Sequence, residues 1–360
     1  MKNSLSLLIT LFIVSFSNAQ IPAGYYDSTT GLTGYALKSQ LKVIVTNGHT
    51  DNGYNALWNA YKTGDLDKYY ENDNTILDIY SERPAGPDAY SYTPGANQCG
   101  NYSGEGQCYN REHVFPQGFF NEAAPMKHDY LHVFPTDGSV NGRRSNYPFG
   151  TVGAASWTST NGSKLGTSSF PGYSGTVFEP IDEFKGDIAR SLLYFITRYE
   201  DRLQQFDYND MNNPQDGSRD RGFEQWYINL LLLWHQNDPV SAKETARNNY
   251  SYVYQKNRNP FIDRPEYVTM IWTSTLATDE NSVSKNSLKI AQNPVRNGEL
   301  KVSGDHIAKI ASAQIISVTG QVVQTIREPF KNSNTIILKN TPKGVYLLKA
   351  DQQTLKFIVE

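Results

Sequence analysis

The chain has 360 residues, a formal net charge of −3 and 38% hydrophobic residues, a globular composition with room for two or three domains. This slightly negative net charge excludes a protein that binds nucleic acid through a broadly basic surface. Any anion-binding site must therefore be a local patch of positive charge. Beyond the first twenty residues, no apolar run is long enough to span a membrane.

The first nineteen residues have the pattern of a secretory signal peptide. Lys2 precedes an apolar run over residues 5–16, and small residues end at Ala19. A basic start, a short apolar core and small residues at the cleavage site define such a signal. The alternative, a membrane anchor, is disfavoured because the run is too short. We expect cleavage after Ala19 and a secreted protein, extracellular or at the cell surface.

Residues 20–275 are predicted to form an α+β body that is mostly helical. Apolar residues at helical spacing predict helices over residues 37–45, 54–61, 188–203, 223–234 and 265–271. A further helix is expected to take Asp238 as its N-cap and Pro239 in its first turn, and to run to about Arg258. Residues 76–80 are predicted to be a strand, residues 89–108 a loop, and residues 150–176 a long connection with room for short strands.

Cys99 and Cys108 are the only cysteines in the chain. In an oxidising compartment they are expected to form a disulfide that braces the segment before residue 109. The alternative is a zinc site, which two cysteines without a CxxC motif or a nearby histidine pair do not favour.

The character of the chain changes after the body. Residues 276–287 are polar and without a period, which predicts a linker, and residues 288–360 contain short apolar runs separated by turn residues. This pattern predicts a small all-β sandwich. From Lys285 onward there are 11 Lys or Arg and 5 Asp or Glu, so the total of −3 divides into about +6 after residue 284 and about −9 before it.

Three segments of the tail, residues 290–295, 316–321 and 343–348, resemble in their order the C-terminal sorting domain of the type IX secretion route. The resemblance implies that a secretion machinery is a partner of the chain. The alternative is a carbohydrate-binding or adhesive sandwich, because many functions share this architecture.

Residues 109–149 contain most of the side chains that could take part in catalysis or bind a metal. Glu112 and His113 are adjacent, Asn141 follows, and a local patch of positive charge comes from Arg111, Lys127, Arg143 and Arg144. A neutral histidine can take a proton from water, and carboxylate and carboxamide oxygens are hard ligands that suit Mg²⁺. Phosphodiester hydrolysis needs an activated water and cations near the developing phosphate charge.

The adjacency of Glu112 and His113 raises a geometric difficulty. Neighbours on a regular strand point to opposite faces, so the two can share a site only where the backbone bends. Taken alone, a Glu-His pair matches by chance, and His113 would be a packed or surface histidine.

Several motifs in order give a more specific signal. They are Asn110-Arg111-Glu112-His113-x-x-Pro116, Asp129-x-x-His132-x-x-Pro135 and Asn141-Gly-x-Arg144-Ser145-Asn146, with further motifs reaching residue 263. Together they resemble the secreted endonuclease I family, whose members are ββα-metal (His-Me finger) nucleases. The resemblance implies a ββα-metal finger inside the helical body.

The same resemblance implies a role for each matched residue. His113 would be the general base, Glu112 and Asn141 the ligands of Mg²⁺ (with Mn²⁺ or Ca²⁺ as substitutes), and Arg144 a contact to the scissile phosphate. The weaker candidates for substrate binding are Arg111, Arg143 and Asn146, and His132 would be a structural hydrogen-bonding residue. Cleavage would leave 5′-phosphate ends.

The leading hypothesis is therefore a secreted, Mg²⁺-dependent and sequence-nonspecific endonuclease, a monomer acting on DNA and, as a further candidate, on RNA. Phosphate contacts carry no sequence information directly, and few residues here are suited to reading bases. One alternative is an extracellular binding or adhesion protein with a structural metal site, which would have no need of His113 as a base. Another is a hydrolase of small phosphodiesters.

Overall fold

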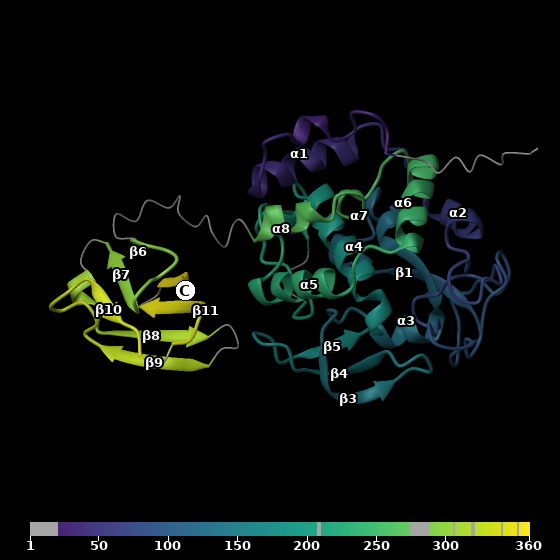
Figure 1. The fold of residues 1–360 in the computed structure, drawn as a ribbon. Helices are drawn as coiled ribbons and strands as arrows, with labels where there is room; N and C mark the ends of the chain where they lie inside the picture. Colours follow the sequence, from purple (N-terminus) through teal and green to yellow (C-terminus); the bar gives the residue numbers. More distant parts are fainter. Residues whose placement is uncertain are drawn as a thin grey trace, which may run out of the picture. The chain divides into compact units, whose positions relative to one another are not determined.

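The computed structural model describes residues 21–206, 210–273, 288–304, 307–317, 321–339, 341–350 and 353–360. The predicted signal peptide, residues 1–19, and the predicted linker, residues 276–287, lie outside this range. The chain divides into two units, Met1–Thr278 and Asp279–Glu360, and each is described by itself (Figure 1).

The larger unit is an α+β body in which helices predominate. Its helices among the described residues are α1 (Gly34–Thr46), α2 (Leu57–Gly64), α3 (Gly138–Arg144), α4 (Lys185–Arg198), α5 (Gln225–Asn237), α6 (Ala242–Gln255), α7 (Pro260–Asp263) and α8 (Glu266–Trp272). Its strands are β1 (Tyr109–His113), β2 (Val133–Asp137), β3 (Val152–Thr158), β4 (Lys164–Ser168) and β5 (Thr176–Glu179). The helices predicted from apolar spacing correspond to α1, α2, α4, α5 and α8.

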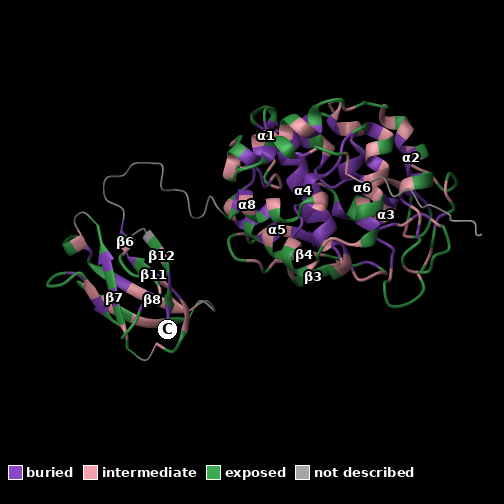
Figure 2. Cartoon of the chain, turned by 45° about the horizontal axis from the view of Figure 1, so that its top comes forward, coloured by how far each residue is buried: buried purple, intermediate pink, exposed green. Residues whose placement is uncertain are grey.

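Helix α4 is the centre of this body. Thirteen of its 14 residues are buried, and it packs against α1, α5 and α7, as the buried colouring in Figure 2 shows. The helix ends at Arg198, whereas Leu203, the last residue of the predicted apolar stripe, lies in a separate short turn. Because α4 is enclosed, its polar residues must find partners inside the protein.

The predicted strand over residues 76–80 is wrong. Ile76 makes only an isolated bridge to Leu66, and the chain then turns around Asp78. The carboxylate of Asp78 accepts from the amide of Tyr80 at 2.8 Å, and its carbonyl accepts from the amide of Glu82 at 3.0 Å. Aspartate draws local backbone donors in this way and competes with strand pairing.

The predicted start of the helix after Asp238 is also wrong. Helix α6 begins at Ala242, and its N-cap is Ser241, which forms a capping box with Glu244. Asp238 instead accepts from the amide of Gly186 at 2.7 Å. It therefore satisfies a free backbone donor in the first turn of α4, a different helix.

The region predicted as a long connection contains an antiparallel sheet of three strands in the order β3-β4-β5. The segment is rich in small polar residues and begins shortly after the end of α3. Phe149, just before β3, bridges to Phe178 of β5 and ties this sheet to the core.

The smaller unit consists mainly of β-strands, as predicted. They are β6 (Lys289–Ile290), β7 (Glu299–Ser303), β8 (Ser312–Ser317), β9 (Val322–Arg327), β10 (Thr335–Ile337), β11 (Gly344–Ala350) and β12 (Gln353–Val359). Two antiparallel sheets form, ordered β10-β7-β6 and β12-β11-β8-β9. Leu300 and Val302 are buried between exposed neighbours on β7, and both sheets contribute to one apolar core. The alternation of apolar and polar residues thus builds a sandwich.

Candidate active site

A two-stranded sheet and the helix after it carry the predicted site residues. Strands β1 and β2 pair antiparallel, with Tyr109 opposite Asp137 and His113 opposite Val133. Helix α3 follows β2 without a loop because Asp137 is its N-cap and accepts from the amide of Val140 at 2.8 Å. The result is a ββα unit within the helical body.

One open cavity of about 440 Å³ lies over this unit. Six of the predicted site residues line it: Arg111, Glu112, His113, Asn141, Arg144 and Asn146. Glu112 and His113 both line this cavity although they are neighbours on β1, and His113 is the last residue of that strand.

Glu112 is almost fully buried and firmly held. Its Oε1 atom accepts from the hydroxyl of Tyr80 at 2.8 Å and lies 3.4 Å from Nη1 of Arg144. Burial raises the pKa of the carboxyl, and Arg144 opposes this effect. No hydrogen bond within the described part of the chain occupies Oε2 of Glu112.

His113 is buried, with its Nε2 atom 3.1 Å from the carbonyl oxygen of Lys127. Burial, followed by the neighbouring His132, lowers the pKa of His113 well below the model-peptide value of 6.5. The ring is therefore neutral near neutral pH. A carbonyl oxygen only accepts, so Nε2 carries the proton and Nδ1 presents a lone pair.

His132 is a second buried imidazole, and its ring centroid lies 5.7 Å from that of His113. Its Nε2 atom donates to the carbonyl oxygen of Met126 at 2.6 Å, and burial lowers its pKa to about 4. Consecutive carbonyls, those of Met126 and Lys127, therefore orient the two histidines.

Asp129 fixes the segment that supplies these carbonyls. Its Oδ2 atom accepts from Nη1 of Arg198 at 2.6 Å and from the hydroxyls of Tyr194 and Tyr199 at 2.9 Å. Gln255 of α6 donates to the other oxygen at 2.7 Å. The core helices α4 and α6 thus set the position of the histidine segment.

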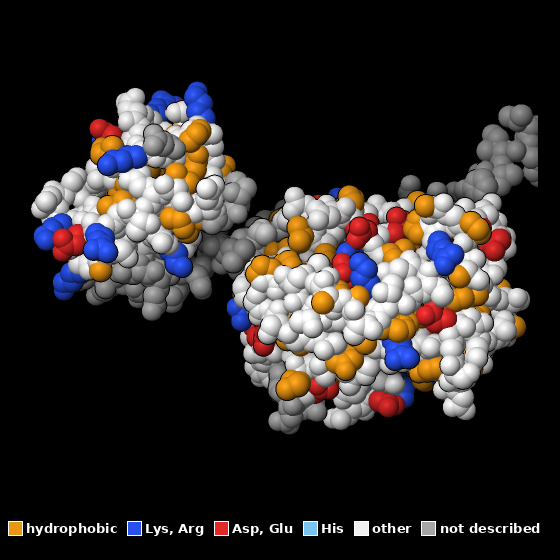
Figure 3. All heavy atoms as spheres, turned by 90° about the horizontal axis from the view of Figure 1, so that it is seen from below, with side chains coloured by type: hydrophobic (Ala, Val, Ile, Leu, Met, Phe, Trp, Pro, Cys, Tyr) orange, Lys and Arg blue, Asp and Glu red, His pale blue; other side chains and the backbone are white. Residues whose placement is uncertain are grey.

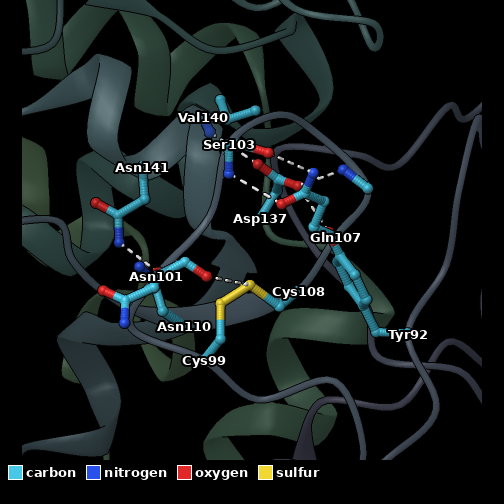
Figure 4. Close-up of a disulfide and its surroundings, with 11 residues drawn as sticks. Tyr92, Cys99, Asn101, Ser103, Gln107, Cys108, Asn110, Asp137, Val140 and Asn141 are labelled. Carbon is cyan, nitrogen blue, oxygen red and sulfur yellow. Dashed lines mark hydrogen bonds between the residues drawn. A yellow bond between two sulfur atoms is a disulfide. The ribbon is translucent and has the colours of Figure 1, made fainter.

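Asn141, on the first turns of α3, is oriented by a neighbour on β1. Its Nδ2 atom donates to Oδ1 of Asn110 at 2.7 Å, and both side chains are drawn in Figure 4. This bond uses the amide nitrogen and leaves the carboxamide oxygen of Asn141 without a partner among the described residues.

Arg144 is 2% exposed at the end of α3. Its Nη1 and Nη2 atoms donate to the carbonyls of His113 and Val114 at 3.0 and 2.6 Å. The guanidinium thereby joins the helix to the end of β1 and places a positive charge beside Glu112.

The two other predicted arginines lie in different surroundings. The guanidinium of Arg111 stacks on Tyr54 at 3.4 Å from the ring centroid and lies 4.4 Å from that of Trp58. Both aromatic residues line the cavity. Arg143 is exposed, lies over Trp157, and does not line the cavity.

The predicted disulfide between Cys99 and Cys108 is present (Figure 4). The loop that it closes is attached to the ββα unit, since the amide of Gly106 donates to Oδ2 of Asp137 at 2.8 Å. Tyr102 of the same loop lies so close to α3 that a Cβ atom at Gly142 would come within 2.2 Å of its hydroxyl. The loop therefore forms one wall of the cavity.

Sequence reasoning missed several contributors to the site. Tyr54 and Trp58, which line the cavity, and Tyr80, which donates to Glu112, come from segments outside the motifs. Only the folded chain brings them to the site. Asn110 stands in a motif, but nothing in the sequence assigns it to Asn141. The residues present fit a Mg²⁺ ion, because the cavity offers two hard oxygen donors and room for water.

The cavity combines a neutral imidazole, oxygen donors and cations. These are the groups that an enzyme needs to hydrolyse phosphodiesters. A family model described as Endonuclease I matches residues 33–266. The chain belongs to this family and is a nuclease.

Two relatives bear the name extracellular ribonuclease. The one from Bacillus amyloliquefaciens is 36% identical over 257 residues, which cover 69% of this chain and 78% of the relative. The one from Bacillus subtilis is 35% identical over 253 residues, with the same coverage of both chains. A model described as a secretion system C-terminal sorting domain matches residues 290–360. The chain is therefore secreted, and none of its described helices is long and apolar enough to cross a membrane.

Proposed function

We propose that the chain is a sequence-nonspecific endonuclease that depends on Mg²⁺, cleaves DNA and RNA, and leaves 5′-phosphate ends. The hydrogen bond from Nε2 of His113 to the carbonyl of Lys127 carries this proposal. It leaves Nδ1 of a neutral imidazole as the base, in the cavity that also holds Glu112 and Asn141. The names of the Bacillus relatives support RNA as a substrate.

In this mechanism, Nδ1 of His113 takes a proton from the attacking water, and Lys127 keeps the ring in the productive orientation. Glu112 and Asn141 would hold the metal ion through Oε2 and Oδ1. Such an ion supplies positive charge to the phosphate and to the leaving oxygen. Tyr80 and Asn110 act as positioning residues, since each fixes one of the two ligand side chains.

The contacts of Arg144 support a positioning role, because they join α3 to the end of β1. Its contact with the scissile phosphate stays a prediction, as do substrate contacts by Arg111 and Asn146. Arg143, exposed beside Trp157, would meet nucleic acid only outside the cavity. The type IX route, as the particular machinery that reads residues 288–360, is part of the same proposal.

The proposal is tested by incubating the purified protein with supercoiled plasmid and with single-stranded RNA, in Mg²⁺ or in EDTA. We expect nicking and RNA cleavage in Mg²⁺, none in EDTA, and products that a kinase labels only after phosphatase treatment. Cleavage that is unaffected by EDTA would remove the metal from the mechanism. Products labelled without phosphatase treatment would contradict the 5′-phosphate ends.

A further inference from the structure

A cluster of carboxylates lies apart from the cavity, in the chain between α2 and β1. We propose that Asp67, Glu71 and Glu82 bind a Ca²⁺ ion that stabilises this part of the body. Each residue offers one oxygen, and these oxygens all lie within 4.8 Å of one another. None of the three residues lines the cavity of the candidate active site.

Two of the three carboxylates are buried and need compensation. Asp67 and Glu82 are 2% and 1% exposed, and no ion pair among the described residues includes any of the three carboxylates. A buried carboxylate is costly unless a cation, a proton or hydrogen-bond donors compensate it. Three carboxylates brought together increase that cost by mutual repulsion.

Hydrogen bonds compensate both oxygens of Asp67, whereas one oxygen of Glu82 has no partner. The two oxygens of Asp67 accept from the backbone amides of Tyr69, Tyr70, Glu71 and Asn72 at 3.0–3.1 Å, so its carboxylate is fixed in place. Oε1 of Glu82 is buried without any hydrogen-bond partner. Burial and the neighbouring Asp88, Glu71 and Asp67 raise the pKa of Glu82 to about 9. Without a cation, a proton neutralises Glu82, and a bound Ca²⁺ would displace that proton.

The ligand type and the compartment favour Ca²⁺. This ion takes six to eight oxygen ligands at about 2.3–2.6 Å, and oxygens on opposite sides of it stand up to about 5 Å apart, whereas Mg²⁺ keeps several waters and few carboxylates. A secreted protein meets Ca²⁺ outside the cell, where weak sites with a Kd of about 0.1–1 mM are useful. Glu71 is exposed and leaves a route for the ion.

The test uses full-length protein carrying Glu112→Gln, which weakens the predicted catalytic ion site, after removal of metals with a chelator. We expect about 10 mM CaCl₂ to raise its Tm by about 3–10 °C. Adding Glu82→Gln should abolish the shift, and adding the exposed change Glu71→Gln should raise the half-saturating Ca²⁺ concentration several-fold. The matched control is Asp73→Asn, an exposed acid outside the cluster, which should keep the full shift.

Two results would overturn the proposal. The first is a Tm that Ca²⁺ does not change in the Glu112→Gln protein, which would mean that a proton compensates Glu82. The second is a shift that survives Glu82→Gln, which would place the ion elsewhere. If the Glu82→Gln protein does not fold, Glu71→Gln decides, and an unchanged half-saturating concentration contradicts the site.

Discussion

The Nε2 atom of His113 lies 3.1 Å from the carbonyl oxygen of Lys127, and this contact determines which nitrogen of the ring can act as a base. The carbonyl cannot donate, so the proton of the neutral ring sits on Nε2. The lone pair on Nδ1 is therefore the one that can accept a proton. The orientation of the ring depends on a backbone carbonyl and not on another titrating side chain.

As the proposed base, His113 would act when unprotonated, so its lowered pKa should extend activity to acidic pH. At saturating Mg²⁺, we expect the acid limb of the kcat/KM profile to have an apparent pKa below 6.5, the ordinary pKa of histidine. The measurement is a rate profile over about pH 5 to 8 with a short labelled oligonucleotide. An acid limb with an apparent pKa at or above 6.5 would contradict the buried, neutral ring.

Asn110 should control metal affinity without touching the metal. In Asn110→Ala, the carboxamide of Asn141 loses the partner that fixes its orientation. Loss of such an outer contact typically weakens metal binding by about 10–100-fold. We expect the Mg²⁺ concentration for half-maximal cleavage to rise by about that factor, with little change in rate at saturation.

The control for this change is Asn59→Ala, an exposed asparagine of α2 that contacts Lys62. It should leave the Mg²⁺ dependence unchanged. Equal Mg²⁺ dependence in the Asn110→Ala and Asn59→Ala proteins would show that Asn110 does not position the ligand.

Removal of the disulfide should cost stability. The bridge closes a short loop whose Gly106 holds Asp137 at the start of α3. For the double change Cys99→Ser and Cys108→Ser, we expect the free energy of unfolding to drop by about 2–3 kcal/mol. Urea unfolding measures this drop, and an unchanged midpoint would mean that the loop does not brace the body.

Asp129 should be among the costliest single residues to neutralise. Asp129→Asn leaves the buried Arg198 without its carboxylate, and breaking such a pair costs about 3–5 kcal/mol. Tyr199→Phe is the matched control, since it removes one hydrogen bond to the same oxygen and should cost about 1 kcal/mol. Chemical unfolding of both variants gives the two values, and similar losses would contradict the role of the ion pair.

The same carboxylate predicts a pH dependence. Arg198, with smaller contributions that include the hydrogen bond from Gln255, outweighs burial and holds the pKa of Asp129 below its usual value. A depressed pKa adds stability that is complete above the unfolded-state pKa of about 3.9 and is lost as the pH falls below it. We therefore expect the Tm of wild type to drop more steeply below about pH 4 than the Tm of Asp129→Asn.

The order of the motifs could predict the residues of the site but not their supports. Glu112, His113 and Asn141 stand in matched segments, and the structure brings them to one cavity. Tyr80 contacts Glu112 from 32 positions away in the sequence. The contact of Lys127 is made by its backbone carbonyl, so the identity of its side chain does not predict it. Apolar periodicity located the helices, since it reflects burial directly.

The errors have a shared physical origin in polar side chains that bond to backbone. Asp78 turns the chain where apolar neighbours predicted a strand, and Asp238 accepts from an amide in the first turn of α4 instead of capping α6. Short-range propensity does not predict which backbone amide an aspartate will bond. An aspartate accepts from whichever free amide the fold places near it.

The central claim, that His113 is the general base, is tested most directly by comparing His113→Ala with His128→Ala in plasmid nicking at saturating Mg²⁺. His128 is a nearby histidine that contacts Asp51 and does not line the cavity. We predict a loss of about 10²–10⁴-fold in rate for His113→Ala and near wild-type cleavage for His128→Ala. A folded His113→Ala protein that nicks as fast as wild type would contradict the account.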